Sequence, residues 1–295
     1  MHAVVVINPV SGPRRYRSVE ACAALARDVL GRHGGTVDVK VTEARGDARA
    51  FGHQARANRA DLVVAWGGDG TINEVASALA FSDVALGIVP GGSGNGLARD
   101  LGIPLEAGPA LEAAAAGHRR RIDAGQIDTT LFFNVAGIGL DAVIAKGIAR
   151  PDARRGLSGY ARLTLLELPR YRPQRYRIQC EGRTDERHAI FIALANSRQY
   201  GNNALIAPAA RLDDGHLNLV VVEAQPLWRI LKRLPDLFRG RLESGPGLLM
   251  QPTTGVTIHA QAAMAYHADG EPGMAGSTLE VRVHAGALQV AAYKQ

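Results

Sequence analysis

The sequence predicts two domains, an α/β domain followed by a mainly β domain. In the first third of the chain, short apolar runs alternate with amphipathic segments of helical length, which is typical of a parallel sheet covered by helices. Beyond about Ile122 the pattern changes to longer strand-like runs with two helical insertions. A chain of 295 residues is long enough for each domain to bury its own core.

The first domain is expected to alternate strands and helices. Strands are predicted at residues 3–8, 36–42, 61–66 and 85–90, and helices at 18–33, 47–59 and 71–80. In such sheets ligands bind beyond the carboxyl ends of the strands. Three of the strands run into turns rich in Gly, Asn and Ser, at residues 8–12, 67–71 and 91–96. Together, three such turns are suited to a di- or triphosphate.

The turn at residues 67–71, Gly-Gly-Asp-Gly-Thr, is the strongest candidate for a binding site. It joins an apolar run to an amphipathic segment, and the Thr71 and Glu74 spacing of a capping box predicts that the helix begins at about Thr71. Backbone N–H groups at such a helix start bind phosphate. Near phosphates, Asp69 would bind a cation or accept a proton, and both are phosphoryl-transfer roles. The alternative is a plain Asp-Gly turn.

The second domain is expected to be built from strands with two inserted helices. Strands are predicted at residues 177–180, 189–195, 217–222, 256–259 and 279–283, and helices at 157–169 and 227–242. Both helical insertions combine leucines with Arg and Lys, a composition suited to an anionic membrane surface. The alternative is that the apolar residues pack on the domain and the basic ones form a solvated face.

Two glycine turns in the second domain contain candidate groups, and one further glycine pattern does not. The Asp213-Asp214-Gly215 turn has a carboxylate that could hold a divalent ion with nearby carbonyls, although a solvated turn fits the spacing as well. The turn at 269–271 places two carboxylates around a glycine. Residues 137–142 match G-x-G-x-x-A, but no acidic residue lies at the distance that a ribose requires, so we expect no dinucleotide site there.

Charge and composition indicate which classes of partner and which cellular location to expect. A net charge of +6 and a pI near 9.6 point to an anionic partner. Aromatic residues are only 5% and form no stacking motif, so no nucleic acid partner is expected. The N-terminal segment lacks a basic flank, no apolar run is long enough to span a bilayer, and the two cysteines suggest neither a disulfide framework nor a zinc site. We therefore expect a cytoplasmic protein.

Five motifs occur together in one order. They are Asn8-Pro9-Val10-Ser11-Gly12, the stretch at 67–75, the stretch at 90–99, Leu212-Asp213-Asp214-Gly215 and Asp269-Gly270-Glu271. In this order the sequence resembles the soluble diacylglycerol kinases and sphingosine kinases. The resemblance implies an α/β nucleotide-binding domain at residues 1–122, to which 287–295 return. It also implies a β-sandwich lipid-binding domain at 123–286, with the active site in the cleft.

The resemblance also implies roles for individual residues. It assigns catalytic roles to Asp69, Asp269 and Glu271, with Asp69 organising Mg²⁺ and either Glu271 or Asp269 as the base. It places a structural Mg²⁺ on the Asp214 carboxylate and the carbonyls of Arg211 and His216. The implied nucleotide contacts are Asn8, Ser11, Gly12, Thr42, Gly67, Gly68, Asp69, Gly70, Thr71, Asn73, Gly92, Ser93 and Asn95.

The expected activity follows from the resemblance. It is ATP- and Mg²⁺-dependent phosphorylation of a primary hydroxyl on diacylglycerol, a sphingoid base or a related lipid. The alternatives are an enzyme like the NAD kinases, which share the glycine turn at 67–71, and a catalytically silent lipid-binding protein. The two basic insertions favour peripheral association with the inner membrane surface, and the sequence leaves a homodimer open.

Overall fold

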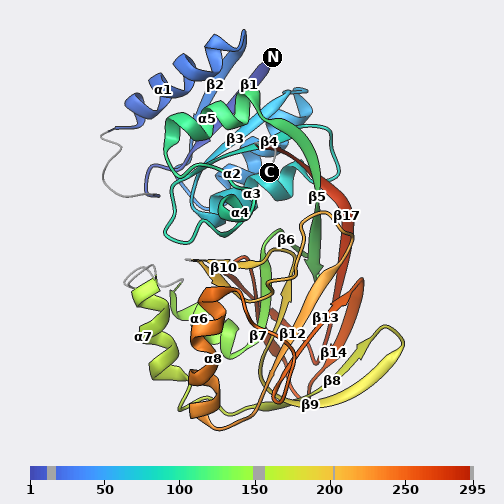
Figure 1. The fold of residues 1–295 in the computed structure, drawn as a ribbon. Helices are drawn as coiled ribbons and strands as arrows, with labels where there is room; N and C mark the ends of the chain where they lie inside the picture. The colour runs from blue at the N-terminus through green and yellow to red at the C-terminus, as the bar shows by residue number, and fades with distance from the viewer. Residues whose placement is uncertain (12–17, 149–156, 202, 293–295) are drawn as a thin grey trace. The chain divides into compact units, whose positions relative to one another are not determined.

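The computed structural model describes residues 1–11, 18–148, 157–201 and 203–292 (Figure 1). The chain divides into two compact units, Met1–Ile122 with Gly286–Gln295, and Asp123–Ala285. The first unit is α/β and the second is mainly β, so the predicted fold class is confirmed. No helix among the described residues is both long enough and apolar enough to cross a bilayer.

The first unit contains a parallel sheet with the strand order β2-β1-β3-β4. The C-terminal part of β17 adds to its edge, where Val290 pairs with Leu86 in parallel. The strands are β1 (His2–Ile7), β2 (Thr36–Val41), β3 (Leu62–Gly67), β4 (Ala85–Pro90) and the end of β17 (Thr278–Ala292). The helices are α1 (Val19–Arg32), α2 (Asp47–Ala57), α3 (Asp69–Leu79), α4 (Gly96–Asp100) and α5 (Ala107–Ala116).

The strand order determines where a ligand can bind. From β1 the chain crosses to β2 on one side, whereas β3 and β4 follow on the other side, so right-handed crossovers place α1 opposite α2 and α3. Accordingly α1 packs with α5, and α2 packs with α3. The sheet therefore has its topological switch point between β1 and β3, where open α/β sheets bind ligands beyond the strand ends.

The predicted start of the third helix was wrong. Helix α3 begins at Asp69, two residues earlier than expected, and Gly68 caps it without a side-chain hydrogen bond. The Glu74 carboxylate does not close its own helix. It accepts the N–H groups of Gly46 and Arg49, at 3.1 and 3.3 Å, at the start of α2. The capping partner is thus a helix that is distant in sequence, which the local spacing could not reveal.

The second unit is built mainly from antiparallel strands in the order β16-β15-β7-β9-β8-β14-β17. From this path, β12 pairs with β9 and β13, while β5 pairs with β6 and β17. The strands are β5 (His118–Ile127), β6 (Thr130–Phe132), β7 (Val135–Gly139), β8 (Gln174–Cys180), β9 (Arg183–Ala195), β10 (Gln199–Gly201), β11 (Ala204–Leu205), β12 (Leu217–Glu223), β13 (Leu248–Thr253), β14 (Gly255–His259), β15 (Met264–Ala268), β16 (Glu271–Ala275) and the start of β17.

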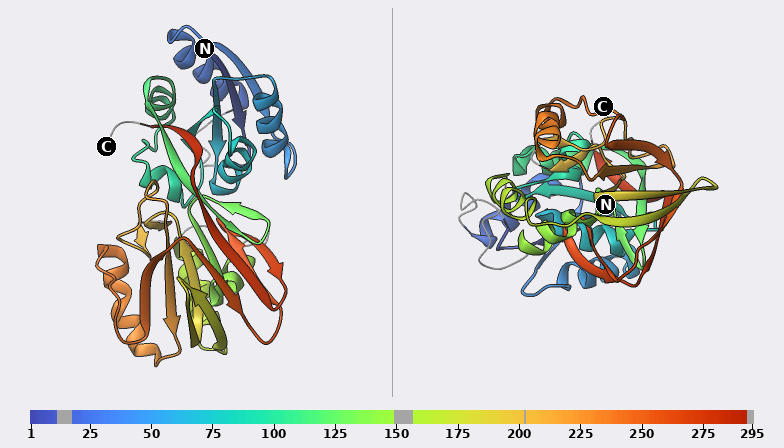
Figure 2. Two further views of the ribbon diagram at one scale, coloured as in Figure 1. Left: turned by 90° about the vertical axis from the view of Figure 1, so that its right-hand side faces the viewer. Right: turned by 90° about the horizontal axis from the view of Figure 1, so that it is seen from below.

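The strands of the second unit enclose one main apolar core. Alternate residues of β8, β9 and β12 meet there, and Ile178, Ile192 and Leu219 are at most 3% exposed. The β8–β9 hairpin projects from the unit in two views (Figures 1 and 2). Among the described residues of this unit, three helices lie outside the core, namely α6 (Leu140–Ile148), α7 (Leu157–Glu167) and α8 (Leu227–Arg239). The two predicted insertions are thus α7 and α8.

Candidate functional site

The turns that follow β1 and β3 are joined by side-chain hydrogen bonds. The Asn8 amide donates to Thr71 Oγ1 at 2.9 Å, and its Oδ1 accepts the Val10 N–H at 3.1 Å. The Ser11 hydroxyl donates to the Asn8 carbonyl at 2.8 Å. One asparagine therefore fixes its own turn and anchors it to the first turn of α3.

The turns that follow β3 and β4 approach each other backbone to backbone. The Gly91 N–H donates to the Gly67 carbonyl at 2.7 Å. A Cβ at Gly92 would lie 2.8 Å from the Gly68 Cα, and a Cβ at Gly67 would lie 2.6 Å from the Thr71 Cβ. Only glycine fits at these positions, and the result is a backbone without side chains, partly exposed at Gly68 and Gly92, at the start of a helix, which is the usual environment of a bound phosphate.

Asp69 connects the same two turns through its carboxylate. It accepts the N–H groups of Asn95 and Gly96, at 3.0 and 2.9 Å, at the start of α4. The Asn95 side chain in turn accepts the Gly92 N–H and donates to the Gly92 carbonyl, both at 2.9 Å. Burial raises the pKa of Asp69, and these N–H groups together with Arg99 oppose that rise only in part. Its carboxylate therefore holds the loop after β4 in place.

The predicted nucleotide-contact residues divide into two groups. Thr42, Thr71, Asn73 and Asn95 are buried, so they shape the turns rather than present side chains to a ligand. Ser93 is exposed on the loop after β4, and Asn8, Ser11, Gly68, Gly70 and Gly92 are partly exposed around the switch point. Gly12 lies outside the described residues. The accessible residues at this site are therefore small, and three of them are glycines whose backbone no side chain covers.

The Asp269-Gly270 turn of the second unit joins β15 to β16. Both residues have positive φ, +49° and +87°, which is the conformation of a tight hairpin turn that favours Asp-Gly. The Asp269 carboxylate accepts three backbone N–H groups, from Phe133 at 2.8 Å, Asn134 at 2.9 Å and Val135 at 3.0 Å. Asp269 is thus a clamp between the turn and the start of β7.

Glu271 follows this clamp directly. It is the first residue of β16, is partly buried, and pairs with Ala268 across the hairpin. Its backbone position is therefore set by the turn that Asp269 fixes. Asp69 belongs to the first unit, whereas Asp269 and Glu271 belong to the second.

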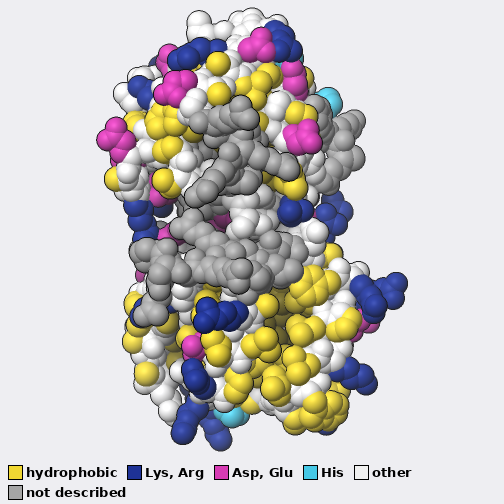
Figure 3. Space-filling model, turned by 90° about the vertical axis from the view of Figure 1, so that its left-hand side faces the viewer, with side chains coloured by type: hydrophobic (Ala, Val, Ile, Leu, Met, Phe, Trp, Pro, Cys, Tyr) yellow, Lys and Arg dark blue, Asp and Glu magenta, His cyan; other side chains and the backbone are white. Residues whose placement is uncertain are grey.

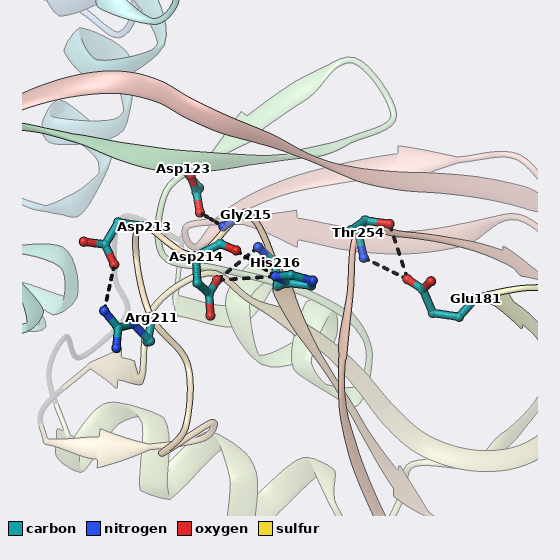
Figure 4. A network of polar contacts seen from close by, with 8 residues as sticks. All are labelled: Asp123, Glu181, Arg211, Asp213, Asp214, Gly215, His216 and Thr254. Carbon is teal, nitrogen blue, oxygen red and sulfur yellow. Dashed lines mark hydrogen bonds and ion pairs between the residues drawn. The ribbon is translucent and has the colours of Figure 1, made fainter.

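The predicted metal turn carries a compact polar network (Figure 4). Asp214 Oδ1 accepts the His216 N–H at 3.0 Å, whereas Asp213 points toward Arg211, with which it forms an ion pair at 3.7 Å. Asp123, which is 2% exposed, accepts the Gly215 N–H at 2.7 Å. Among the described residues no group of three or more His, Cys, Asp or Glu side chains could hold a metal. An ion here would need backbone carbonyls, and the predicted set, one carboxylate with the Arg211 and His216 carbonyls, is the all-oxygen set that Mg²⁺ prefers.

Several site residues were missed by sequence reasoning. Asp123 lies within β5, with no motif around it. Asp141 and His267 form a buried pair at 2.8 Å although 126 positions separate them. The signal for Asp141 was present in the glycine pattern at 137–142, which we interpreted only as a test for dinucleotide binding. For His267 the only signal was its position two residues before Asp269.

Comparisons with protein families match both parts of the chain. Residues 2–127 match the model of the diacylglycerol kinase catalytic domain, and residues 134–292 match that of the YegS C-terminal NAD kinase beta sandwich-like domain. Proteins named "Probable lipid kinase YegS" from Salmonella newport (strain SL254) and Salmonella typhimurium (strain LT2) are 32% identical over 261 residues. These alignments cover 86% of this chain and 85% of the relatives.

Solved structures share the fold. A "putative diacylglycerol kinase" from Bacillus anthracis str. Sterne superposes with a TM-score of 0.83 at 21% identity, covering 99% of this chain and 96% of that one. A second structure, of a diacylglycerol kinase from the same organism, has a TM-score of 0.76 at 18% identity over the same shares. At these identities the likeness is evidence for the fold alone.

Asp69 should make the free energy of unfolding depend on pH. Because burial raises its pKa above the usual 3.8, the folded chain holds this proton more tightly than the unfolded chain. The stabilisation from Asp69 is therefore complete below about pH 3.8 and is lost as the pH rises through the raised pKa. The difference in free energy of unfolding between the wild type and Asp69→Asn should fall over that range in urea titrations. A difference that is constant or that rises with pH contradicts this assignment.

Proposed function

The chain belongs to the lipid kinases that combine a diacylglycerol kinase catalytic domain with a YegS-type β-sandwich domain, and we propose that it transfers the γ-phosphoryl group of ATP to a primary hydroxyl of a lipid. The observation that carries this proposal is the set of glycine turns held together at the switch point of the first sheet. Backbone N–H groups at the start of α3, where Gly68 and Gly70 are partly exposed, suit the phosphates of ATP. The match to the diacylglycerol kinase catalytic domain favours a lipid acceptor over the dinucleotide acceptor of an NAD kinase.

We assign the role of general base to Glu271. Hydrogen bonds from backbone N–H groups stabilise an ionised carboxylate and make it a weaker base. Asp269 accepts three such bonds, which weaken it as a base. The Asp69 carboxylate, whose pKa burial raises, is occupied by the N–H groups of Asn95 and Gly96, so both residues are better suited to holding the backbone of the site. Glu271 stands next to the Asp269 clamp and would accept the proton of the lipid hydroxyl as its oxygen attacks the γ-phosphorus.

Mg²⁺ is proposed in two roles. Bound with ATP, it would neutralise charge on the phosphates. Held at residues 211–216, it would stabilise the turn that Asp123 and Asp214 already organise by hydrogen bonding. The second role concerns folding stability, so it can be tested without an activity assay.

The surface of α8 supports peripheral binding to an anionic membrane. Its inner face packs on the unit through Ile230 and Leu237. Its other apolar residues form an exposed stripe, of which Trp228 is 60% and Phe238 45% exposed. This stripe, the α8 stripe, comprises Leu227, Trp228, Leu231, Leu234 and Phe238.

Basic residues and a second helix extend the α8 stripe. Arg229 lies over the Trp228 ring at 5.2 Å, and Lys232 and Arg239 are exposed on the same helix. Helix α7 adds Leu165 and Leu166, which are 66% and 42% exposed, and the face that carries both helices shows gathered hydrophobic side chains with Arg and Lys around them (Figure 3). Apolar side chains flanked by cations are the composition of an interfacial helix.

Glu271→Gln should lower kcat by roughly 10²- to 10⁴-fold because it removes the base without changing volume. The melting temperature should stay close to that of the wild type. The assay is transfer of labelled phosphate from ATP to a bacterial lipid extract. Glu280→Gln, an exposed and isosteric change on β17, serves as the control. Wild-type turnover in Glu271→Gln would overturn the assignment.

Mg²⁺ should raise the melting temperature through Asp214. An ion that binds only the folded state adds about 2.7 kcal/mol at a concentration 100 times its Kd. We expect Asp214→Asn to abolish this increase in melting temperature. Asp213→Asn should retain it, because the Asp213 carboxylate of the wild type faces Arg211. Calorimetry with Mg²⁺ and with a chelator measures both. Equal increases in all three proteins would exclude the metal site.

Binding to vesicles that contain anionic lipid should depend on α8 and weaken with salt, as the screening length falls to about 3 Å at 1 M. Reversal of Arg229, Lys232 and Arg239 to Glu should abolish sedimentation with these vesicles while ATP binding persists. Arg233 is left unchanged because it donates to the carbonyls of Glu243 and Pro246 and so anchors the helix.

The control for this variant has the same charge change elsewhere. Arg27, Arg59 and Arg183 are exposed outside α7 and α8, and their reversal to Glu should leave vesicle binding largely intact. Equal loss in both triple variants would mean that net charge, not α8, governs binding. No sedimentation of the wild type with any vesicle would refute membrane association.

A further inference from the structure

A buried His–Asp pair lies directly beneath the turn that carries Asp269 and Glu271. His267 Nε2 is 2.8 Å from Asp141 Oδ2, and both side chains are at most 7% exposed. His267 belongs to β15 and Asp141 to the first turn of α6. The pair therefore links the hairpin to the helix that follows β7.

The backbone around this pair leaves room for it. Gly137 on β7 lies opposite His267 in the sheet. A Cβ at Gly137 would be 1.8 Å from Asp141 Oδ2 and 2.5 Å from His267 Nε2, so no other residue fits without moving the pair. This close approach accounts for the first glycine of the G-x-G-x-x-A pattern. In this protein, the first glycine of the pattern makes room for the buried pair of Asp141 and His267.

The other ring nitrogen of His267 faces the turn itself. The Gly270 N–H points at His267 Nδ1 at 3.2 Å. A backbone N–H can only donate, so this contact requires the neutral ring, in which Nδ1 accepts and the proton lies on Nε2, facing Asp141. Burial lowers the pKa of His267 but the Asp141 and Asp269 carboxylates raise it by more, so the contact forms above that raised pKa. The Tyr200 ring lies nearly perpendicular to the imidazole, with the two ring centroids 6.5 Å apart. Asp141 thereby fixes the tautomer that Gly270 requires.

We propose that His267, oriented by Asp141, is a positioning residue for phosphoryl transfer that holds Gly270 and so aims Glu271. The proposal rests on the proposed function, because it assumes that Glu271 acts on the lipid hydroxyl. Asp269 clamps one side of the turn to residues 133–135, and His267 holds the other side through Gly270. With both sides fixed, the first residue of β16 has a defined position. A misplacement of a catalytic group by about 1 Å can lower a rate by about 100-fold.

Substitutions of His267 can test the role of Nδ1 separately from that of Nε2. In His267→Gln the amide nitrogen can replace Nε2 and keep the bond to Asp141, but nothing accepts the Gly270 N–H. In the double variant His267→Asn with Asp141→Asn, the Asn oxygen can replace Nδ1 and no buried charge is left unpaired. Asp141→Asn alone keeps acceptors for both bonds and is the matched control. If His267→Gln does not fold, the double variant His267→Ala with Asp141→Asn replaces it, because this variant also lacks an acceptor for the Gly270 N–H.

The expected result is a selective loss of kcat. His267→Gln, and Ala at 267 in the Asp141→Asn background, should lower kcat by roughly 10- to 100-fold with KM for ATP and lipid nearly unchanged. The Asn double variant and Asp141→Asn should stay within about threefold of the wild type by the same geometric argument. Hydrogen exchange of the Gly270 amide should become faster only in the variants that lose kcat.

Other outcomes separate the two proposals. If Glu271→Gln is inactive while the variants without the Nδ1 acceptor keep wild-type kcat, the positioning role is refuted and the proposed function stands. If kcat of all four variants follows their melting temperatures, the pair is structural only, which also refutes the proposal. If Glu271→Gln is fully active, the assigned base is wrong, while protection of the Gly270 amide still reports whether His267 holds the turn.

Discussion

The arrangement of the first unit depends on the hydrogen bonds that Asp69 forms with the backbone of Asn95 and Gly96. They tie the start of α3 to the start of α4, so the turns after β3 and β4 are held as one piece. The tight packing at Gly92, and at Gly94, where a Cβ would be 2.9 Å from Asp69 Oδ2, follows from the same contact. A buried carboxylate that has partners is stable, whereas its removal would leave two amides without acceptors.

In the second unit, too, an aspartate carboxylate holds a turn by accepting backbone N–H groups. The Asp269 carboxylate also accepts backbone N–H groups, but the turn that it fixes leads directly into another acidic residue, Glu271. Hydrogen bonds that favour the ionised form make a carboxylate a good structural anchor and a poor base. In the proposed mechanism, two neighbouring acids therefore have different tasks. Asp269 fixes the turn, and Glu271, which the turn positions, acts as the base. Sequence motifs do not distinguish these tasks, because both residues belong to the same three-residue pattern.

What the sequence could predict follows from how local each signal is. The alternation of apolar runs located every predicted strand and helix of the first unit to within about two residues, because these periods are set by nearby residues. The start of α3 was wrong because Glu74 caps α2 rather than its own helix. The confirmed family resemblance came from motif order. The clamp on residues 133–135 and the Asp141–His267 pair join segments more than 100 positions apart, and no local pattern encodes such contacts.

Helix α8 shows how composition can predict an amphipathic helix without predicting which side faces the protein. The sequence contains enough apolar residues to cover two faces, and the structure uses Ile230 and Leu237 for packing and leaves the α8 stripe in contact with solvent. Exposed apolar area costs roughly 25 cal/mol per Å², so such a stripe is favourable only if something covers it for part of the protein's working cycle. An enzyme whose acceptor is a lipid meets a surface of the right chemistry whenever it meets its substrate. In the proposed membrane-bound state, Arg229 beside Trp228 would place a cation at the depth of the headgroups while the ring enters the acyl boundary, and substrate access and membrane binding would then depend on the same helix.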